Sequence, residues 1–259
     1  EDLKLPGNRF AGACFTSGSA GTMSAGDYLK DVYPALKLAV GEALQCPTIL
    51  ANGFGSHRIE GIGDKHIPWI HNVRNTDMVI DIDDEDSQRL LRLFNTDPGK
   101  RYLKEELKLE DEQIEALSLM GISGIANLLC CIKMAKYYEL TEKDVIGTVL
   151  TDSADMYRSR IEELDALHGT YDLQEAEMDH QLHLLGMRTD NMAELTYTDR
   201  KRIHNLKYYT WVEQQGRDVD ELNALWYDPE NTWEAVHTQA KELDALIEAF
   251  NEATGLLKN

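Results

Sequence analysis

The chain has 259 residues, of which 42% are hydrophobic and 28% are charged, a composition typical of a globular protein with one large or two moderate cores. Its formal net charge of −20 argues against nucleic acid and anionic membranes as partners, because both require a basic surface. No apolar run approaches the ~18 residues of a membrane span and no signal peptide is visible, so we expect a cytoplasmic protein without a membrane partner.

The first part of the chain, from Phe10 to about Arg158, alternates short apolar runs with helical patterns. Strands are predicted over Phe10–Phe15, Leu38–Glu42, Met78–Ile82 and Val145–Leu150, and helices over Ser24–Tyr33, Glu85–Phe94 and Gly124–Tyr138. This alternation predicts βα units in an α/β fold, with a mostly parallel sheet flanked by helices. The acidic run Asp83–Asp86 is interpreted as a helix cap rather than a metal site, and the charged insert Asp97–Leu119 as a helical surface excursion.

Beyond Arg158 the strand signals stop, which predicts an all-helical C-terminal extension. One helix is expected from Arg200 to Gln215 and another from Asn231 to Gly255. The second carries an apolar stripe of Trp233, Val236, Ala240, Leu243, Ile247 and Phe250. Such a stripe must pack on something; docking within the chain is the simpler interpretation, and a coiled-coil dimer contact is the alternative. The predicted organisation is therefore a core over residues 1–158 and a helical extension over residues 159–259.

The cysteines and histidines show no pattern that indicates a metal site. The chain contains four cysteines, Cys14, Cys46, Cys130 and Cys131. They have neither zinc spacing nor a CxxC motif, so we expect reduced, mostly buried thiols. His180 and His183 lack a Cys or carboxylate cluster that would complete a zinc site, and we interpret them as a pair on a helix surface.

A loop of small residues, Gly18-Ser19-Ala20-Gly21-Thr22, lies between the first predicted strand and the first predicted helix. A strand, a tight turn and a helix offer backbone N–H groups and a helix N-terminus to a phosphate. No Lys follows in Walker spacing, and the glycines do not match the dinucleotide fingerprint. By itself the loop is interpreted equally well as a tight βα turn.

Two more segments contain glycines close to chemically useful positions. Gly61-Ile62-Gly63, shortly before Pro68, marks a place where backbone comes close to another group. The run from Gly121 to Asn127 opens an apolar helix and contains Ser123. Taken alone, a Ser at a helix start is most simply an N-cap.

These segments, in this order and at this spacing, resemble the fold-type II pyridoxal phosphate enzymes, the family of cysteine synthase, cystathionine β-synthase and threonine dehydratase. The strand containing Val40-Gly41-Glu42 and the terminal run from Val149 to Tyr157 also match. The resemblance covers roughly Phe10 to Tyr157 and is greatest to cysteine synthases. Residues 159–259 lie outside it and resemble the helical extension of a longer bacterial subgroup.

The resemblance implies a role for each matched residue and pyridoxal 5′-phosphate as the cofactor of the complete enzyme. The loop residues Gly18, Ser19, Ala20, Gly21 and Thr22 would bind the cofactor phosphate; Gly61, Ile62 and Gly63 would line the cofactor and substrate face; and Ser123 would hydrogen-bond the pyridine nitrogen. Cysteine synthases usually have Gly where this chain has Ala20, and we expect the turn to survive because its Cβ is small. A neutral hydroxyl does not hold the ring nitrogen protonated, which suits β-elimination or β-replacement on a small L-amino acid.

Two further segments of the family have no counterpart in this sequence. The segment with the Schiff-base lysine and the loop that grips the substrate carboxylate are both missing, and Lys30, Lys65 and Lys133 lie in the wrong contexts to replace that lysine. We therefore expect the C-terminal part of a lyase or transferase that forms a homo-oligomer, a dimer in most of the family, or joins a missing N-terminal half. The alternative is a non-catalytic fragment or scaffold that retains the fold and binds phosphate or a partner chain.

Overall fold

The computed structural model describes residues 7–255, which form two compact units. The first unit extends to Ile203 and the second begins at His204. The helices that directly follow Arg158 therefore pack with the first unit, although the sequence boundary was predicted at residue 158 where the strand signals stop. That prediction concerns the end of the family-like core, and it stays a prediction.

The first unit is built on a five-stranded sheet in the order β4-β1-β2-β3-β5. Its strands are β1 (Arg9–Thr16), β2 (Lys37–Ala43), β3 (Met78–Ile82), β4 (Asp144–Gly147) and β5 (Met192–Glu194). The first four pair in parallel, as predicted, whereas β5 runs antiparallel to β3. The predicted α/β class is confirmed with two corrections: β4 ends three residues earlier than expected, and the C-terminal extension contributes a strand and is not all-helical.

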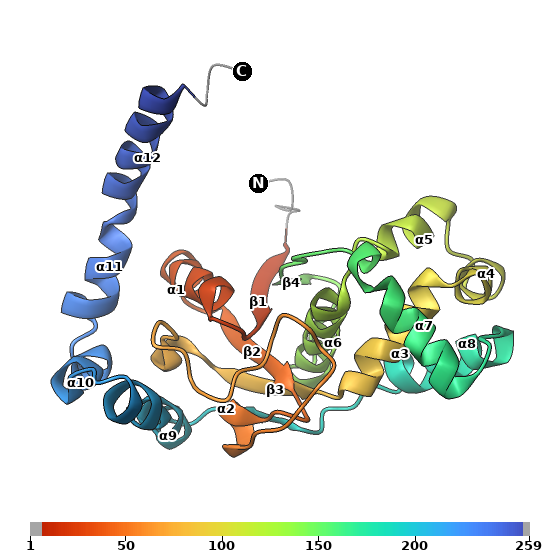
Figure 1. The fold of residues 1–259 in the computed structure, drawn as a ribbon, viewed down its shortest axis with the longest axis horizontal. Helices are drawn as coiled ribbons and strands as arrows, with labels where there is room; N and C mark the ends of the chain where they lie inside the picture. The colour runs from red at the N-terminus through yellow and green to blue at the C-terminus, as the bar shows by residue number, and fades with distance from the viewer. Residues whose placement is uncertain (1–6, 256–259) are drawn as a thin grey trace. The chain divides into compact units, whose positions relative to one another are not determined.

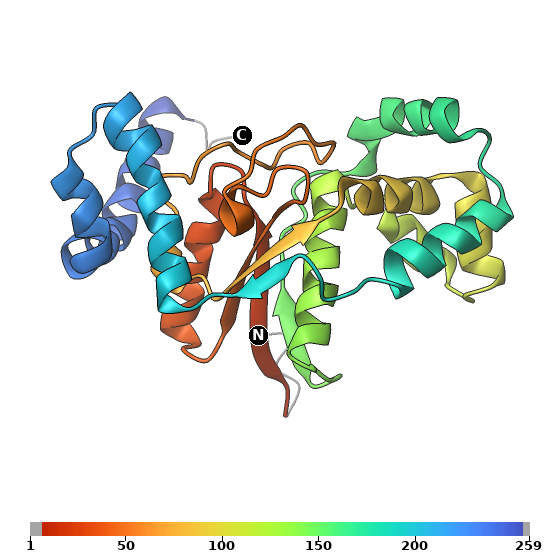
Figure 2. The ribbon, with the colours of Figure 1, turned by 90° about the horizontal axis from the view of Figure 1, so that it is seen from below.

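Helices cover both faces of this sheet (Figure 1). The α-helices are α1 (Gly21–Val32), α2 (Thr48–Ala51), α3 (Asp84–Asn95), α4 (Asp97–Glu105), α5 (Asp111–Leu117), α6 (Ile122–Tyr137), α7 (Arg158–His168), α8 (Leu173–Asp179), α9 (Tyr197–Lys207), α10 (Val219–Tyr227), α11 (Ala235–Thr238) and α12 (Ala240–Thr254). Short 3₁₀ segments lie at Val73–Asn75 and Ala154–Tyr157, and π-helical segments at His180–Leu185, Tyr208–Gln214 and Glu230–Glu234. Figure 2 shows α1 and α6 on opposite faces of the sheet.

The sequence explains why these elements form. Both faces of β2 and β3 are buried, as the continuous apolar runs predict for strands of a covered parallel sheet. Asp83 caps α3, since its side chain accepts a hydrogen bond from the N–H of Glu85, which confirms the interpretation of the acidic run. Thr96 caps α4 in the same way, so the charged insert is helical as expected. The main core lies between the sheet, α3 and α6, where Ile80, Leu91 and similar side chains are fully buried.

The second unit is helical and packs around aromatic side chains. Trp233 is buried, and its indole N–H donates to the carbonyl oxygen of Leu225 at 2.8 Å. Of the predicted apolar stripe, Trp233 is thus docked within the unit, whereas Val236, Leu243, Ile247 and Phe250 are each more than half exposed. The coiled-coil contact stays a prediction.

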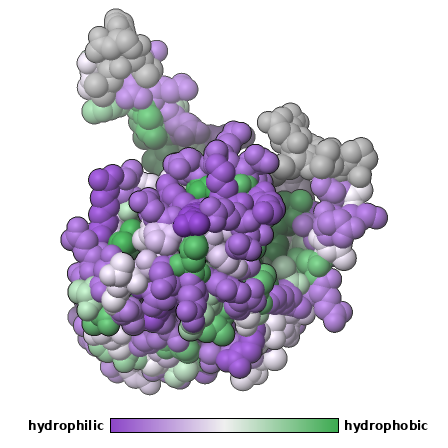
Figure 3. Space-filling model, turned by 90° about the vertical axis from the view of Figure 1, so that its right-hand side faces the viewer, coloured by the Kyte–Doolittle hydropathy of each residue, from purple (hydrophilic) through white to green (hydrophobic). Residues whose placement is uncertain are grey.

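The surface of the first unit around α4, α5 and α8 is largely hydrophilic (Figure 3). Cys14, Cys46 and Cys130 are buried free thiols and Cys131 is half-buried, as expected. Within residues 7–255, no single helix is both long enough and apolar enough to cross a membrane; α5 and α6 reach that length and composition only as a pair bent by 109°.

Candidate functional site

A cavity of about 350 Å³ opens where the parallel strands β1 and β4 end. It is lined by Thr16, Gly18, Ser19, Ala20, Gly21, Thr22, Gly61, Ile62, Ser123, Asn127, Val149 and Thr151. The structure therefore brings together every predicted site residue except Gly63, which follows Ile62 in the sequence but does not line the cavity. Ligands of open α/β sheets bind in this position, outside the carboxyl ends of the strands.

The predicted phosphate loop forms one wall of the cavity and leads into α1. Ala20 precedes the helix in the left-handed conformation, with φ of 65°, so the turn forms although Ala occupies a conformation that favours Gly. No side chain caps α1, and no acidic residue lies in its first turn. The first N–H groups of a helix lack intrahelical acceptors, so Gly21 and Thr22 offer donors and a positive dipole end to a ligand.

The turn Gly61-Ile62-Gly63 lies against this loop, and its first two residues line the cavity. Gly61 and Gly63 have φ of 83° and 80°, which explains why both positions are glycine. The N–H of Gly63 donates to the carbonyl oxygen of Ser17 at 2.8 Å. A Cβ added to Gly18 would lie 3.0 Å from the carbonyl oxygen of Gly61, so the two backbones are in close contact. The glycines thus allow the loop and the turn to enclose the cavity together.

Ser123 reaches the cavity from the first turn of α6. It is 5% exposed, and it does not cap the helix, because Gly121 occupies the N-cap position and no side chain caps α6. Instead its Oγ lies 3.1 Å from Oγ1 of Thr151, which forms a pair of hydroxyl groups at the cavity. The simple interpretation of Ser123 as an N-cap is therefore wrong. Two uncapped helix N-termini, those of α1 and α6, contribute residues to one cavity, and both favour a ligand with negative charge.

Four lining residues, Thr16, Asn127, Val149 and Thr151, were not predicted as site residues from the sequence. Asn127 accepts a hydrogen bond from the N–H of Thr16 at 2.8 Å and donates to the carbonyl oxygen of Val149 at 2.9 Å. It therefore holds the end of β1 and the segment after β4 at a fixed separation. Its position four residues after Ser123 in an apolar helix was the available signal, because residues i and i+4 share a helix face.

None of the described residues that line the cavity is a lysine, so Lys30, Lys65 and Lys133 are not among its lining residues. Lys133 is buried on α6 and donates to the backbone carbonyl of Asp81 at 2.9 Å. Lys30 pairs with Asp77 at 2.6 Å.

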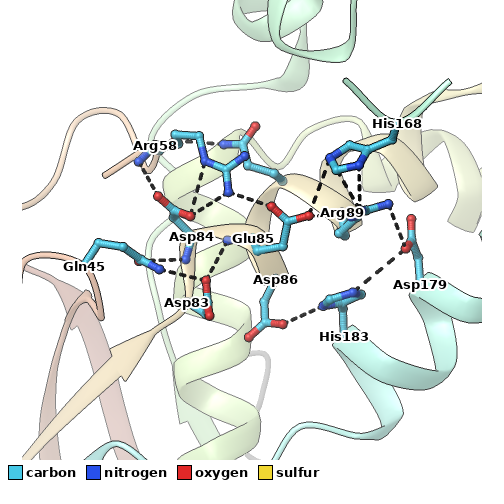
Figure 4. A network of polar contacts seen from close by, with 11 residues as sticks. Gln45, Arg58, Asp83, Asp84, Glu85, Asp86, Arg89, His168, Asp179 and His183 are labelled. Carbon is cyan, nitrogen blue, oxygen red and sulfur yellow. Dashed lines mark hydrogen bonds and ion pairs between the residues drawn. The ribbon is translucent and has the colours of Figure 1, made fainter. Parts of the chain in front are cut away.

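Behind the turn Gly61–Gly63, a network of charged side chains surrounds the N-terminus of α3 (Figure 4). The backbone N–H of Arg58 donates to Asp84 at 2.8 Å, and its guanidinium contacts Asp84 at 2.7 Å and Glu85 at 2.6 Å. Burial opposes the ionisation of Glu85, but the guanidinium groups of Arg58 and Arg89 hold its pKa at about 2. The network continues to His183, whose Nδ1 lies 2.6 Å from Asp86. No group of carboxylates, histidines and cysteines in the described chain could hold a metal ion.

Outside the cavity, two buried carboxyl groups, Glu42 and Asp81, are direct neighbours on β2 and β3. Glu42 accepts hydrogen bonds from the N–H groups of Ile49 and Leu50 at 2.9 and 2.8 Å. Burial raises the pKa of Asp81 to about 9, and the repulsion of Glu42 adds to this effect. Burial also raises the pKa of Glu42, to about 6, because its backbone hydrogen bonds offset part of the desolvation. The pair therefore shares one proton at neutral pH.

Fold and cavity together define an α/β protein with a cavity at the carboxyl ends of its strands, lined in part by the uncapped first turns of α1 and α6. No family model matches the chain. The chain is 32% identical over 143 residues to cysteine synthase B of Campylobacter jejuni, and 28% identical over 143 residues to a cysteine synthase of Staphylococcus aureus. Each match covers 55% of this chain and 40% of the relative, so the chain spans well under half the length of these curated proteins.

A solved structure supports the fold assignment. O-acetyl serine sulfhydrylase isoform 3 from Entamoeba histolytica superimposes with a TM-score of 0.50 and 20% identity, over 66% of this chain and 45% of that protein. The predicted resemblance to cysteine synthase-like, fold-type II pyridoxal phosphate enzymes is thereby confirmed.

Proposed function

We propose that this chain supplies the phosphate- and ring-binding part of a pyridoxal 5′-phosphate site in a cysteine synthase-like enzyme. The observation that supports the proposal most is the convergence of the loop Gly18–Thr22, the turn Gly61–Ile62 and Ser123 on one cavity. The uncapped N-terminus of α1 fits a phosphate, and the hydroxyl of Ser123 fits a neutral ring nitrogen as a hydrogen-bond partner.

The proposed reaction is β-elimination or β-replacement on a small L-amino acid. Pyridoxal phosphate, when bound, supplies an electron-withdrawing ring. The chain's own residues would bind its phosphate through backbone N–H groups and orient the ring between the two glycine-containing walls. The proposal includes a homo-oligomer in the cytoplasm, for which the support is the resemblance to the family.

The binding site can be tested on the 259-residue chain by titration of ¹⁵N-labelled protein with inorganic phosphate, pyridoxal phosphate and pyridoxal. We expect phosphate to shift the amide signals of Gly18–Thr22 with a Kd of about 1 mM, which corresponds to roughly 4 kcal/mol. Pyridoxal phosphate should bind more tightly and also shift Ser123, whereas pyridoxal should bind least. Shifts confined to other surfaces would contradict the proposal, and equal affinity for phosphate and pyridoxal phosphate would favour a phosphate-binding scaffold.

Replacing Ser123 by Ala separates recognition of the ring from recognition of the phosphate. Because Ser123 is not a cap, the loss of stability should be limited to its hydrogen bond with Thr151, about 1 kcal/mol. We expect the affinity for pyridoxal phosphate to fall about fivefold, as for one lost hydrogen bond, with the affinity for inorganic phosphate unchanged. Ser118→Ala is the matched control, since that hydroxyl is exposed and bonds within its own turn. An equal fall for both ligands would show that Ser123 does not contact the ring.

A further inference from the structure

The turn Gly61–Gly63 can define the cavity only if contacts of the residues next to it fix its position. One anchor is Arg58, which the carboxylates at the N-terminus of α3 hold through the backbone N–H and the guanidinium (Figure 4). The amide of Gln88 also donates to the carbonyl oxygen of Arg58 at 2.8 Å. The beginning of the turn is therefore attached firmly to the core of the first unit.

A second anchor comes from α7, in the region beyond the family-like core. Arg160 donates from Nε to Oε1 of Glu60 at 2.6 Å, and a second guanidinium nitrogen lies 2.5 Å from the same oxygen. The third guanidinium nitrogen, Nη1, lies 2.5 Å from Oε2 of Glu163. The other carboxylate oxygen of Glu60 is buried and has no hydrogen-bond partner among residues 7–255, so Arg160 supplies the contacts that compensate this charge.

Glu60 immediately precedes Gly61, so its side chain and the cavity wall move together. We propose that Arg160 is a positioning residue, which holds Glu60 and thereby fixes the turn Gly61–Gly63 against the phosphate loop. The inference rests on the proposed function, because it assigns the anchor of an anion site. Arg160 also neutralises the carboxylate of Glu60, whose neighbour Gly61 lines the cavity, in a chain that already carries a net charge of −20. A helix outside the family-like core would thus control the affinity of the site.

The test compares Arg160→Met with Arg158→Met in the full 259-residue chain. Arg158 lies on the same helix, but its side chain is 79% exposed and pairs with Asp155, three residues away, so it serves as the matched control. We expect Arg160→Met to weaken phosphate binding about threefold to fivefold and Arg158→Met to leave it unchanged. Glu60→Gln combined with Arg160→Met should bind no more weakly than Arg160→Met alone, because both changes remove one interaction.

Amide hydrogen exchange gives a readout that requires no ligand. The N–H of Gly63, bonded to Ser17, should exchange about threefold to tenfold faster in Arg160→Met and at the parental rate in Arg158→Met. A lower melting temperature with unchanged phosphate affinity and unchanged exchange at Gly63 would overturn the inference and leave Arg160 a structural residue. Absence of phosphate binding in the parental chain would overturn the proposed function instead, and the exchange rates would still decide whether Arg160 fixes the turn.

Discussion

Gly21→Asp should abolish phosphate binding by this chain and leave its fold intact. A Cβ at Gly21 would meet no atom of the described residues within 4 Å, so a side chain can leave the backbone there without displacing a neighbour. An Asp in the first turn of α1 also interacts favourably with the helix dipole, by up to about 1 kcal/mol. Its carboxylate would, however, occupy the place where the phosphate binds and would repel it. We expect at least a ~30-fold loss of phosphate affinity with a melting temperature equal to or above that of the parent, measured by amide titration and calorimetry.

Gly21→Ala is the control for this prediction, because it adds the Cβ without the charge. It should change phosphate affinity less than threefold, since the open space at Gly21 accommodates a methyl group. If Gly21→Asp retained parental affinity, the N-terminus of α1 would not be the anion site. If both variants lost affinity equally, steric exclusion rather than charge would be the cause.

Those site residues could be predicted from the sequence whose residue type itself indicates a local structural requirement. The glycines of the loop and of the turn are required by close backbone contact or by positive φ, so Gly18, Gly61 and Gly63 were identifiable from sequence. Thr151 gave no such signal, because its relation to Ser123 arises only when the segment after β4 folds over the start of α6.

The fold shows the same division between local and long-range causes. Strands β1 and β3 follow from their apolar runs, and β3 has the predicted bounds. Strand β5 was missed because it has three residues and exists through its pairing with β3. The helix expected from Arg200 to Gln215 begins earlier, at Tyr197, and continues as a π-helical segment, a change of hydrogen-bond register that helical periodicity does not reveal.

The buried pair of Glu42 and Asp81 is the feature with the greatest expected effect on stability. Apolar runs predicted both strands, but neither run indicated that the two acids are adjacent, because this depends on the register of β2 and β3. Lys133 moderates the pKa of Asp81 only partly, since burial and Glu42 dominate. A protein that keeps such a pair in its sheet must bury a proton together with it.

Asp81→Asn should therefore stabilise the protein at neutral and alkaline pH. Because folding raises the pKa of Asp81 from 3.8 to about 9, the contribution of this side chain to the free energy of unfolding is fully present below pH 3.8. It is lost as the pH rises towards 9. An amide keeps the shape of the side chain and cannot ionise. We expect a gain of about 2 kcal/mol in the free energy of unfolding at pH 8. This is less than the raised pKa alone would give at about 1.4 kcal/mol for each pKa unit, because the amide is itself buried.

Urea denaturation at pH 4, 6 and 8 measures this effect. The difference between Asp81→Asn and the parent should be near zero at pH 4 and should grow at each step. Asp155→Asn, a change at a side chain that is 76% exposed, removes the same formal charge and controls for the general relief of a net charge of −20. A difference that is independent of pH, or equal in both variants, would show that Asp81 is ionised in the folded protein and that the two carboxylates do not share a proton.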